Sequence, residues 1–94
     1  MSNKIGGYTE WGEPDEMCQK LADRCKNKAE IIMKEKYSKF KVVSCRSAVV
    51  SGMLFNLKID VGNDSLLRLN LFEKPWVKNS LEIQRVGYDN KNVD

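Results

Sequence analysis

The chain has 94 residues, a net charge of +3 and no histidine. Its length suits a single domain over residues 1–94. The absence of histidine excludes Cys-His and Ser-His nucleophilic sites and mixed Cys/His zinc sites, because all of these need an imidazole. The positive charge is small and spread along the chain, which is not typical of a nucleic-acid-binding surface. We therefore expect no enzyme, no nucleic-acid partner, no metal and no cofactor.

Three cysteines, Cys18, Cys25 and Cys45, cannot all pair within one chain, and their spacing matches no zinc motif. Free cysteines most often behave as small buried hydrophobic residues. The first residues lack the apolar segment of a signal peptide. No apolar run approaches the roughly 20 residues of a membrane span. These features favour a cytoplasmic protein without a membrane partner.

The N-terminal part predicts a flexible segment followed by one long helix. Residues 1–13 contain three glycines and are expected to form a flexible trunk. The pattern is helical over 14–36, with Pro14 in the first turn because its fixed φ suits that position. The apolar residues recur at helical steps and predict one buried stripe. These residues are Met17, Leu21, Cys25, Ala29, Ile32 and Met33.

Four strands are predicted after the helix, over 40–50, 53–61, 65–72 and 81–88, followed by a polar tail at 89–94. In the last strand the alternation slips near Arg85, which indicates a bulge. Short connections imply antiparallel neighbours. One long N-terminal helix laid across the apolar face of this sheet gives an α+β, two-layer domain with four to five antiparallel strands.

Two of the predicted turns are unusually apolar. The turn at 50–52 and the break at Pro75-Trp76 fall at the same end of an up-and-down sheet, whereas the polar turn at 62–64 falls at the other. Trp76 either folds back onto the core or remains exposed, and an exposed tryptophan is a favoured anchor of interfaces. Two apolar turns at one end of the sheet favour a binding surface there.

Three short motifs follow one another along the chain: Ile5-Gly6-Gly7, Ala48-Val49-Val50-Ser51-Gly52 and Pro75-Trp76. In this order they resemble motifs of the stefins, the intracellular type 1 cystatins similar to cystatins A and B. Ile5-Gly6-Gly7 precedes the helix, and Ala48-Val49-Val50-Ser51-Gly52 looks like the family's Gln-x-Val-x-Gly loop. Pro75-Trp76 is similar to a pair common in the second hairpin of secreted cystatins. The resemblance covers nearly the whole chain and implies a cystatin-like fold.

The resemblance also implies a function: reversible, tight-binding inhibition of papain-like cysteine proteases of the cathepsin type. In this family the trunk and two hairpin turns form a wedge that fills the active-site cleft. Gly6 would lie nearest the catalytic cysteine, and Trp76 would cover the primed side. The protease-binding residues implied here are Ile5, Gly6, Gly7, Ala48, Val49, Val50, Ser51, Gly52, Pro75 and Trp76.

One position departs from the family pattern, because Ala48 stands where the family has glutamine. The lost hydrogen bond would weaken binding about tenfold on the scale of 0.5–1.5 kcal/mol per bond. The alternative function is a non-inhibitory, cystatin-like module that binds another protein through the same surface. The chain is expected to be a monomer, and a domain-swapped dimer formed by opening of the first hairpin remains an alternative.

Overall fold

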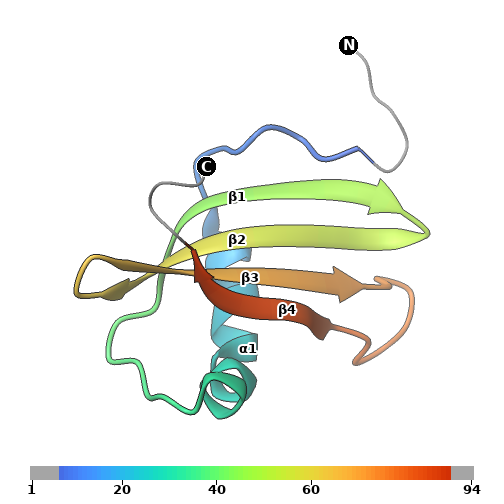
Figure 1. Cartoon of the computed structure of the whole chain (residues 1–94). Coiled ribbons are helices and arrows are strands. Elements are labelled where there is room, and N and C mark those ends of the chain that lie inside the picture. Colours follow the sequence, from blue (N-terminus) through green and yellow to red (C-terminus); the bar gives the residue numbers. More distant parts are fainter. Residues whose placement is uncertain (1–6, 90–94) are drawn as a thin grey trace.

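The computed structural model describes residues 7–89, which contain one helix and one four-stranded antiparallel sheet. The helix α1 spans Glu16–Met33, and the strands are β1 (Lys41–Val50), β2 (Gly52–Gly62), β3 (Ser65–Glu73) and β4 (Glu82–Asp89). The sheet order is β1-β2-β3-β4, so each strand pairs with the next along the chain. Figure 1 shows α1 crossing one face of the sheet. The predicted α+β architecture is confirmed.

The helix is shorter than predicted at both ends. Asp15 is the N-cap, and its carboxylate accepts the Cys18 amide at 2.9 Å, a hydrogen bond that lowers the pKa of Asp15. Pro14 therefore precedes the cap. At the other end Lys34 adopts a left-handed conformation, φ 58°, and its amide bonds back to the carbonyls of Glu30 and Ile31. The prediction over 14–36 missed this end because a lysine seldom takes that conformation.

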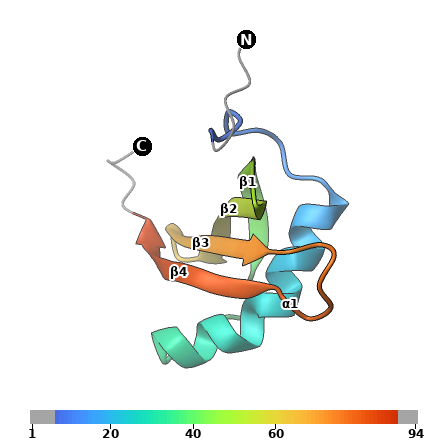
Figure 2. The same cartoon turned by 90° about the vertical axis from the view of Figure 1, so that its right-hand side faces the viewer.

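The core lies between α1 and the facing side of the sheet. The helix buries Cys18, Leu21, Ala22, Cys25 and Ala29. The sheet contributes its fully buried residues Leu57, Ile59, Leu67, Leu69 and Leu71. Two residues of the predicted stripe, Met17 and Ile32, are more than half exposed, so that part of the prediction is wrong. The last turns of α1, which carry Ile32, extend beyond β4 (Figures 1 and 2).

Two bulges set the orientation of the outer strands. Between β3 and β4 the register shifts where Asn70 faces Arg85 and Leu71 faces Ile83, which confirms the bulge predicted near Arg85. A second bulge, at Val43 in β1, was not predicted. It adds one residue to β1, and this reverses the side on which every later β1 residue points. Arg46 and Ala48 consequently face away from α1.

The start of β1 is tied to the helix by one side chain. The Gln19 amide donates to the Phe40 carbonyl and accepts from the Val42 amide, each at 2.9 Å. The preceding connection is held at Tyr37, whose amide donates to the Glu30 carboxylate at 2.8 Å and whose hydroxyl lies 3.0 Å from the Tyr88 hydroxyl on β4. These bonds fix the layer spacing at both edges of the sheet.

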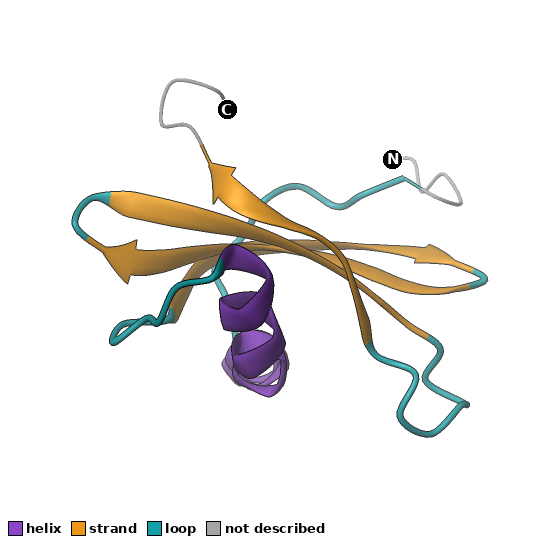
Figure 3. Ribbon diagram, turned by 60° about the horizontal axis from the view of Figure 1, so that its bottom comes forward, coloured by secondary structure: helices purple, strands orange, loops and turns teal. Residues whose placement is uncertain are grey.

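The trunk, residues 1–13, is described from Gly7 onward and lies against β1. The Thr9 amide donates to the Ser47 carbonyl at 2.8 Å, and Gly12 and Cys45 exchange two backbone bonds at 2.9 and 3.1 Å. Figure 3 shows this segment on the side of the sheet opposite α1, which we call the outer face. The trunk is therefore attached to the sheet at residues 9 and 12.

Candidate functional site

The β1–β2 turn and the β3–β4 connection lie at one end of the sheet, which we call the hairpin end (Figure 1). The trunk runs antiparallel to β1, because Gly12 faces Cys45 while Thr9 faces Ser47. Its direction brings Gly7, which is exposed, toward the hairpin end. The other two predicted trunk residues, Ile5 and Gly6, lie outside the described residues. Three segments distant in sequence thus converge on one end of the molecule.

The β1–β2 turn is extremely tight. Val50 pairs directly with Gly52, so Ser51 alone forms the connection. Gly52 has φ +144°, and a Cβ added there would lie 2.7 Å from the Phe72 ring and 2.9 Å from the Glu73 carbonyl oxygen. Only glycine meets both conditions. Next to the turn, Val49 is 62% exposed, so this turn presents apolar surface to solvent.

Ala48 is placed differently from its neighbours in the predicted motif. Its side chain points to the outer face, where the Val43 bulge directs it, and it is only 2% exposed. It pairs with Leu54 across the sheet. Ala48 therefore offers almost no surface to a partner, while the adjoining turn residues Val49 and Ser51 are exposed.

The β3–β4 connection holds Trp76 away from the core. Lys74 to Val77 form a turn closed by the Val77 amide and the Lys74 carbonyl at 2.8 Å. The Ser80 hydroxyl accepts from the Lys74 amide and donates to its carbonyl at 2.9 and 2.8 Å, which closes the base of the loop. Trp76 is 69% exposed at the tip. Of the two possibilities, the structure thus has the exposed tryptophan.

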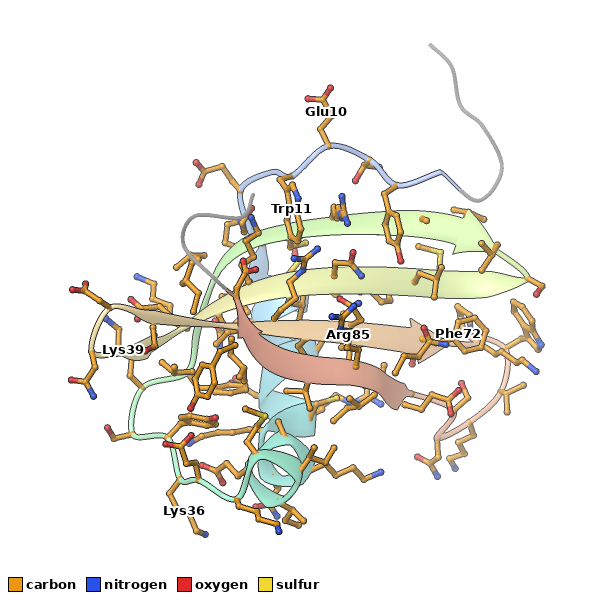
Figure 4. All side chains as sticks on the ribbon, viewed as in Figure 1. Glu10, Trp11, Lys36, Lys39, Phe72 and Arg85 are labelled. Carbon is orange, nitrogen blue, oxygen red and sulfur yellow. The ribbon has the colours of Figure 1, made fainter. Side chains whose placement is uncertain are left out.

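A cluster on the outer face was not predicted. Arg46 lies 4.5 Å from the ring centroid of Tyr8 and 4.6 Å from that of Trp11. Lys58 and Arg68 lie 4.4 and 4.9 Å from the Trp11 ring. Figure 4 shows Trp11 directed toward the sheet and the neighbouring Glu10 directed away. The only sequence feature that indicated this cluster was the presence of cationic residues on the polar sides of three strands, namely Arg46, Lys58 and Arg68.

The described residues contain no group of His, Cys, Asp or Glu side chains that could hold a metal ion. Within the same part of the chain, no helix has both the length and the apolar character needed to cross a bilayer.

The thiols of Cys25 and Cys45 lie in surroundings that keep them protonated and therefore unreactive. Burial raises the pKa of Cys25. Burial, followed by a hydrogen bond with Cys18, raises the pKa of Cys45 to about 12. A thiol reacts as its thiolate, so both groups are protonated at neutral pH.

We expect Cys45 in the folded protein to react far more slowly with iodoacetamide at pH 8 than in the urea-unfolded chain. A pKa of about 12 against an unfolded value of 9.0 lowers the thiolate fraction by about three orders of magnitude. Because the folded pKa is raised, the stabilisation is complete below pH 9.0 and is lost as the pH rises toward 12. Mass spectrometry of labelled peptides measures the rates, and equal rates in both states would contradict the packing.

No family model matches the chain. Among curated proteins, mouse cystatin-A is 37% identical over 90 residues, which are 95% of this chain and 91% of that relative. Rat cystatin-A is 39% identical over 67 residues, 71% of this chain and 65% of the relative. Bovine stefin-C is 30% identical over 91 residues and 90% of each chain. The chain belongs to the stefin family. Stefins are cysteine protease inhibitors and not enzymes, so this stefin was correctly predicted to be a non-enzyme.

Proposed function

We propose that this stefin is a reversible, tight-binding inhibitor of papain-like cysteine proteases of the cathepsin type, and that it binds through the hairpin end. The observation that supports this most is the convergence there of the trunk, the β1–β2 turn and the β3–β4 connection (Figure 1). Val49 and Trp76 give this end two exposed apolar side chains. A narrow apolar end is better suited to binding in the cleft of a partner than to binding on a flat partner surface.

Each segment has a separate role in this proposal. The protease-contacting residues of the trunk are Ile5, Gly6 and Gly7, and Gly6 lies closest to the catalytic cysteine because glycine leaves room for the approach. Val49, Val50 and Ser51 fill the centre of the cleft. Pro75 and Trp76 cover the primed side, where a tryptophan buries a large apolar area.

The geometry favours affinity because both turns are already closed. The β1–β2 turn consists of Ser51 alone. The base of the β3–β4 connection is closed by hydrogen bonds between the Ser80 hydroxyl and the Lys74 backbone. A preformed surface loses little conformational entropy on docking, so more of the contact energy appears as affinity.

The test is titration of papain and of a lysosomal cathepsin endopeptidase with the purified chain, followed with a fluorogenic peptide. We expect reversible inhibition at nanomolar concentration. A variant that lacks residues 1–6 should inhibit at least about tenfold more weakly, because the contacts of Ile5 and Gly6 are lost while Gly7 and the two turns remain. A variant with alanine at Glu16, an exposed residue of α1, serves as the control with unchanged inhibition.

Absence of inhibition at micromolar concentration, with an intact circular dichroism spectrum, would contradict the proposal. That result would favour the alternative function, a non-inhibitory module that binds another protein at the hairpin end. Ala48 favours that alternative, since the side chain that replaces the family's glutamine is almost fully buried and offers no hydrogen-bonding group. The variant Ala48→Gln tests whether the glutamine strengthens inhibition at this position.

We further propose that the chain is a cytoplasmic monomer. The three free cysteines fit a reducing compartment. A dimer formed by exchange of the first hairpin would need the turn at Ser51 to open. Gel filtration at high concentration distinguishes the two states.

A further inference from the structure

The trunk is held to the outer face by aromatic rings in addition to backbone bonds. Tyr8 and Trp11 share one cation, the Arg46 guanidinium, at 4.5 and 4.6 Å from their ring centroids. Cations attract the negative face of an aromatic ring at these distances. We use the term latch for five side chains, those of Tyr8, Trp11, Arg46, Lys58 and Arg68.

The cation at the centre of the latch is fixed by the sheet. The Arg46 Nε donates to the Asn56 side-chain oxygen at 2.9 Å, across the β1–β2 pair. Asn56 is 2% exposed and its amide nitrogen lies 3.4 Å from the Tyr8 hydroxyl. Because Asn56 is buried, it holds the Arg46 guanidinium in one orientation. The rings of Tyr8 and Trp11 therefore pack against a cation whose position is fixed.

Trp11 also relieves a repulsion within the sheet. Lys58 and Arg68 face each other directly across β2 and β3, and like charges in that position destabilise a sheet. Asp89 lies 4.0 Å from Lys58 and 3.5 Å from Arg68 and supplies one negative charge for the two. The Trp11 ring, at 4.4 and 4.9 Å, adds its negative face to the same pair.

The part of the latch around Trp11 lies away from the hairpin end. Lys58 is six positions along β2 from Gly52, which corresponds to about 20 Å of extended chain. Trp11 is therefore not placed to be a protease contact. It lies on the trunk between the helix and the residues expected to enter the cleft, and the trunk is fixed to β1 on either side of it, at residues 9 and 12.

We propose that Trp11 is a positioning residue for protease binding: the latch holds the trunk along β1 and directs the residues before it to the hairpin end. This inference rests on the proposed function. It assigns to the outer face a part in inhibition without any contact between that face and the protease. It also explains why four charged or polar side chains of the sheet, Arg46, Asn56, Lys58 and Arg68, converge beneath two rings.

The latch itself is tested without a protease, by hydrogen exchange of the Thr9 and Gly12 amides. In Trp11→Ala both amides should exchange about tenfold faster, because three cation–ring contacts are lost. Trp11→Phe keeps a weaker ring and should give an intermediate rate. Glu10→Ala is the matched control with unchanged exchange, since Glu10 points away from the sheet. Unchanged protection in Trp11→Ala, with the amides of β2 and β3 protected as in the wild type, would overturn the latch.

The positioning role is tested by combining Trp11→Ala with deletion of residues 1–6. In the full chain Trp11→Ala should weaken inhibition of papain about tenfold. In the shortened chain its effect should be much smaller, because Gly7 is then the one proposed trunk contact left to be directed. An equal loss in both backgrounds would mean that Trp11 acts on the fold or touches the protease, and would overturn the inference. If the wild type itself fails to inhibit, the proposed function and the positioning role both fall, whereas the exchange rates still decide the latch.

Discussion

Replacement of Gly52 by alanine is expected to destabilise the fold by about 2–4 kcal/mol, from a clash and from backbone strain together. The new Cβ would lie 2.7 Å from the Phe72 ring and 2.9 Å from the Glu73 carbonyl oxygen. The ring can move, but the carbonyl belongs to β3 and cannot move without breaking its register. The free energy of unfolding in urea measures the loss.

The same substitution should greatly weaken protease inhibition if the proposed function holds, because the turn carries Val49 and Ser51. Gly87→Ala is the control: a Cβ there has nothing within 4 Å and the backbone needs no positive φ, so the change should stay within about 0.5 kcal/mol. Combining Gly52→Ala with Phe72→Leu should recover the part of the loss that is due to the ring. Full stability in Gly52→Ala would show that the turn relaxes without cost.

The fold was predictable because its signals are local and repeated. The alternation of Leu67, Leu69 and Leu71 places three residues on one side of a strand, and all three are fully buried. Short polar or apolar breaks between such segments leave only antiparallel pairing between neighbours. The bulge near Arg85 was also visible, because the alternation itself slips there.

Features that depend on one exceptional backbone angle, or on an extra residue that leaves no mark on the apolar alternation, were not predictable. Nothing in Val42-Val43-Ser44 distinguishes a bulge from a continuous strand, and yet the bulge decides that Arg46 and Ala48 face outward. The helix end has the same character, since Lys34 takes a conformation that usually belongs to glycine. These choices are settled by packing between layers, which a pattern along the chain does not contain.

The candidate site was predictable where it consists of turns and missed where it depends on contacts across the chain. Pro75-Trp76 and Ser51-Gly52 interrupt the strand pattern, and such interruptions predict turns. Trp11 and Arg46 are 35 positions apart, and their contact arises only when the trunk lies along β1. The outward direction of the Ala48 side chain was missed because the bulge that causes it was missed.

Replacement of Trp76 by alanine is expected to weaken inhibition by about 2–4 kcal/mol, roughly 30- to 1000-fold, while stability changes by no more than about 0.5 kcal/mol. The two effects separate because the ring is 69% exposed in the free protein and has little left to lose on the core side. In the proposed complex the ring would be buried against the protease, and a tryptophan buried at an interface contributes strongly to affinity. Inhibition constants and urea unfolding, measured on the same preparation, give both numbers.

Two variants make the result specific to the hairpin end. Trp76→Phe keeps an apolar ring in the same loop and should lose less affinity than alanine. Ile31→Ala removes an equally exposed apolar side chain, 71% exposed, from α1 and should leave inhibition unchanged. Equal inhibition by Trp76→Ala and wild type would remove the β3–β4 connection from the interface. A large loss of stability in Trp76→Ala would instead show that the ring packs on the fold, because the loop closed through Ser80 would then depend on it.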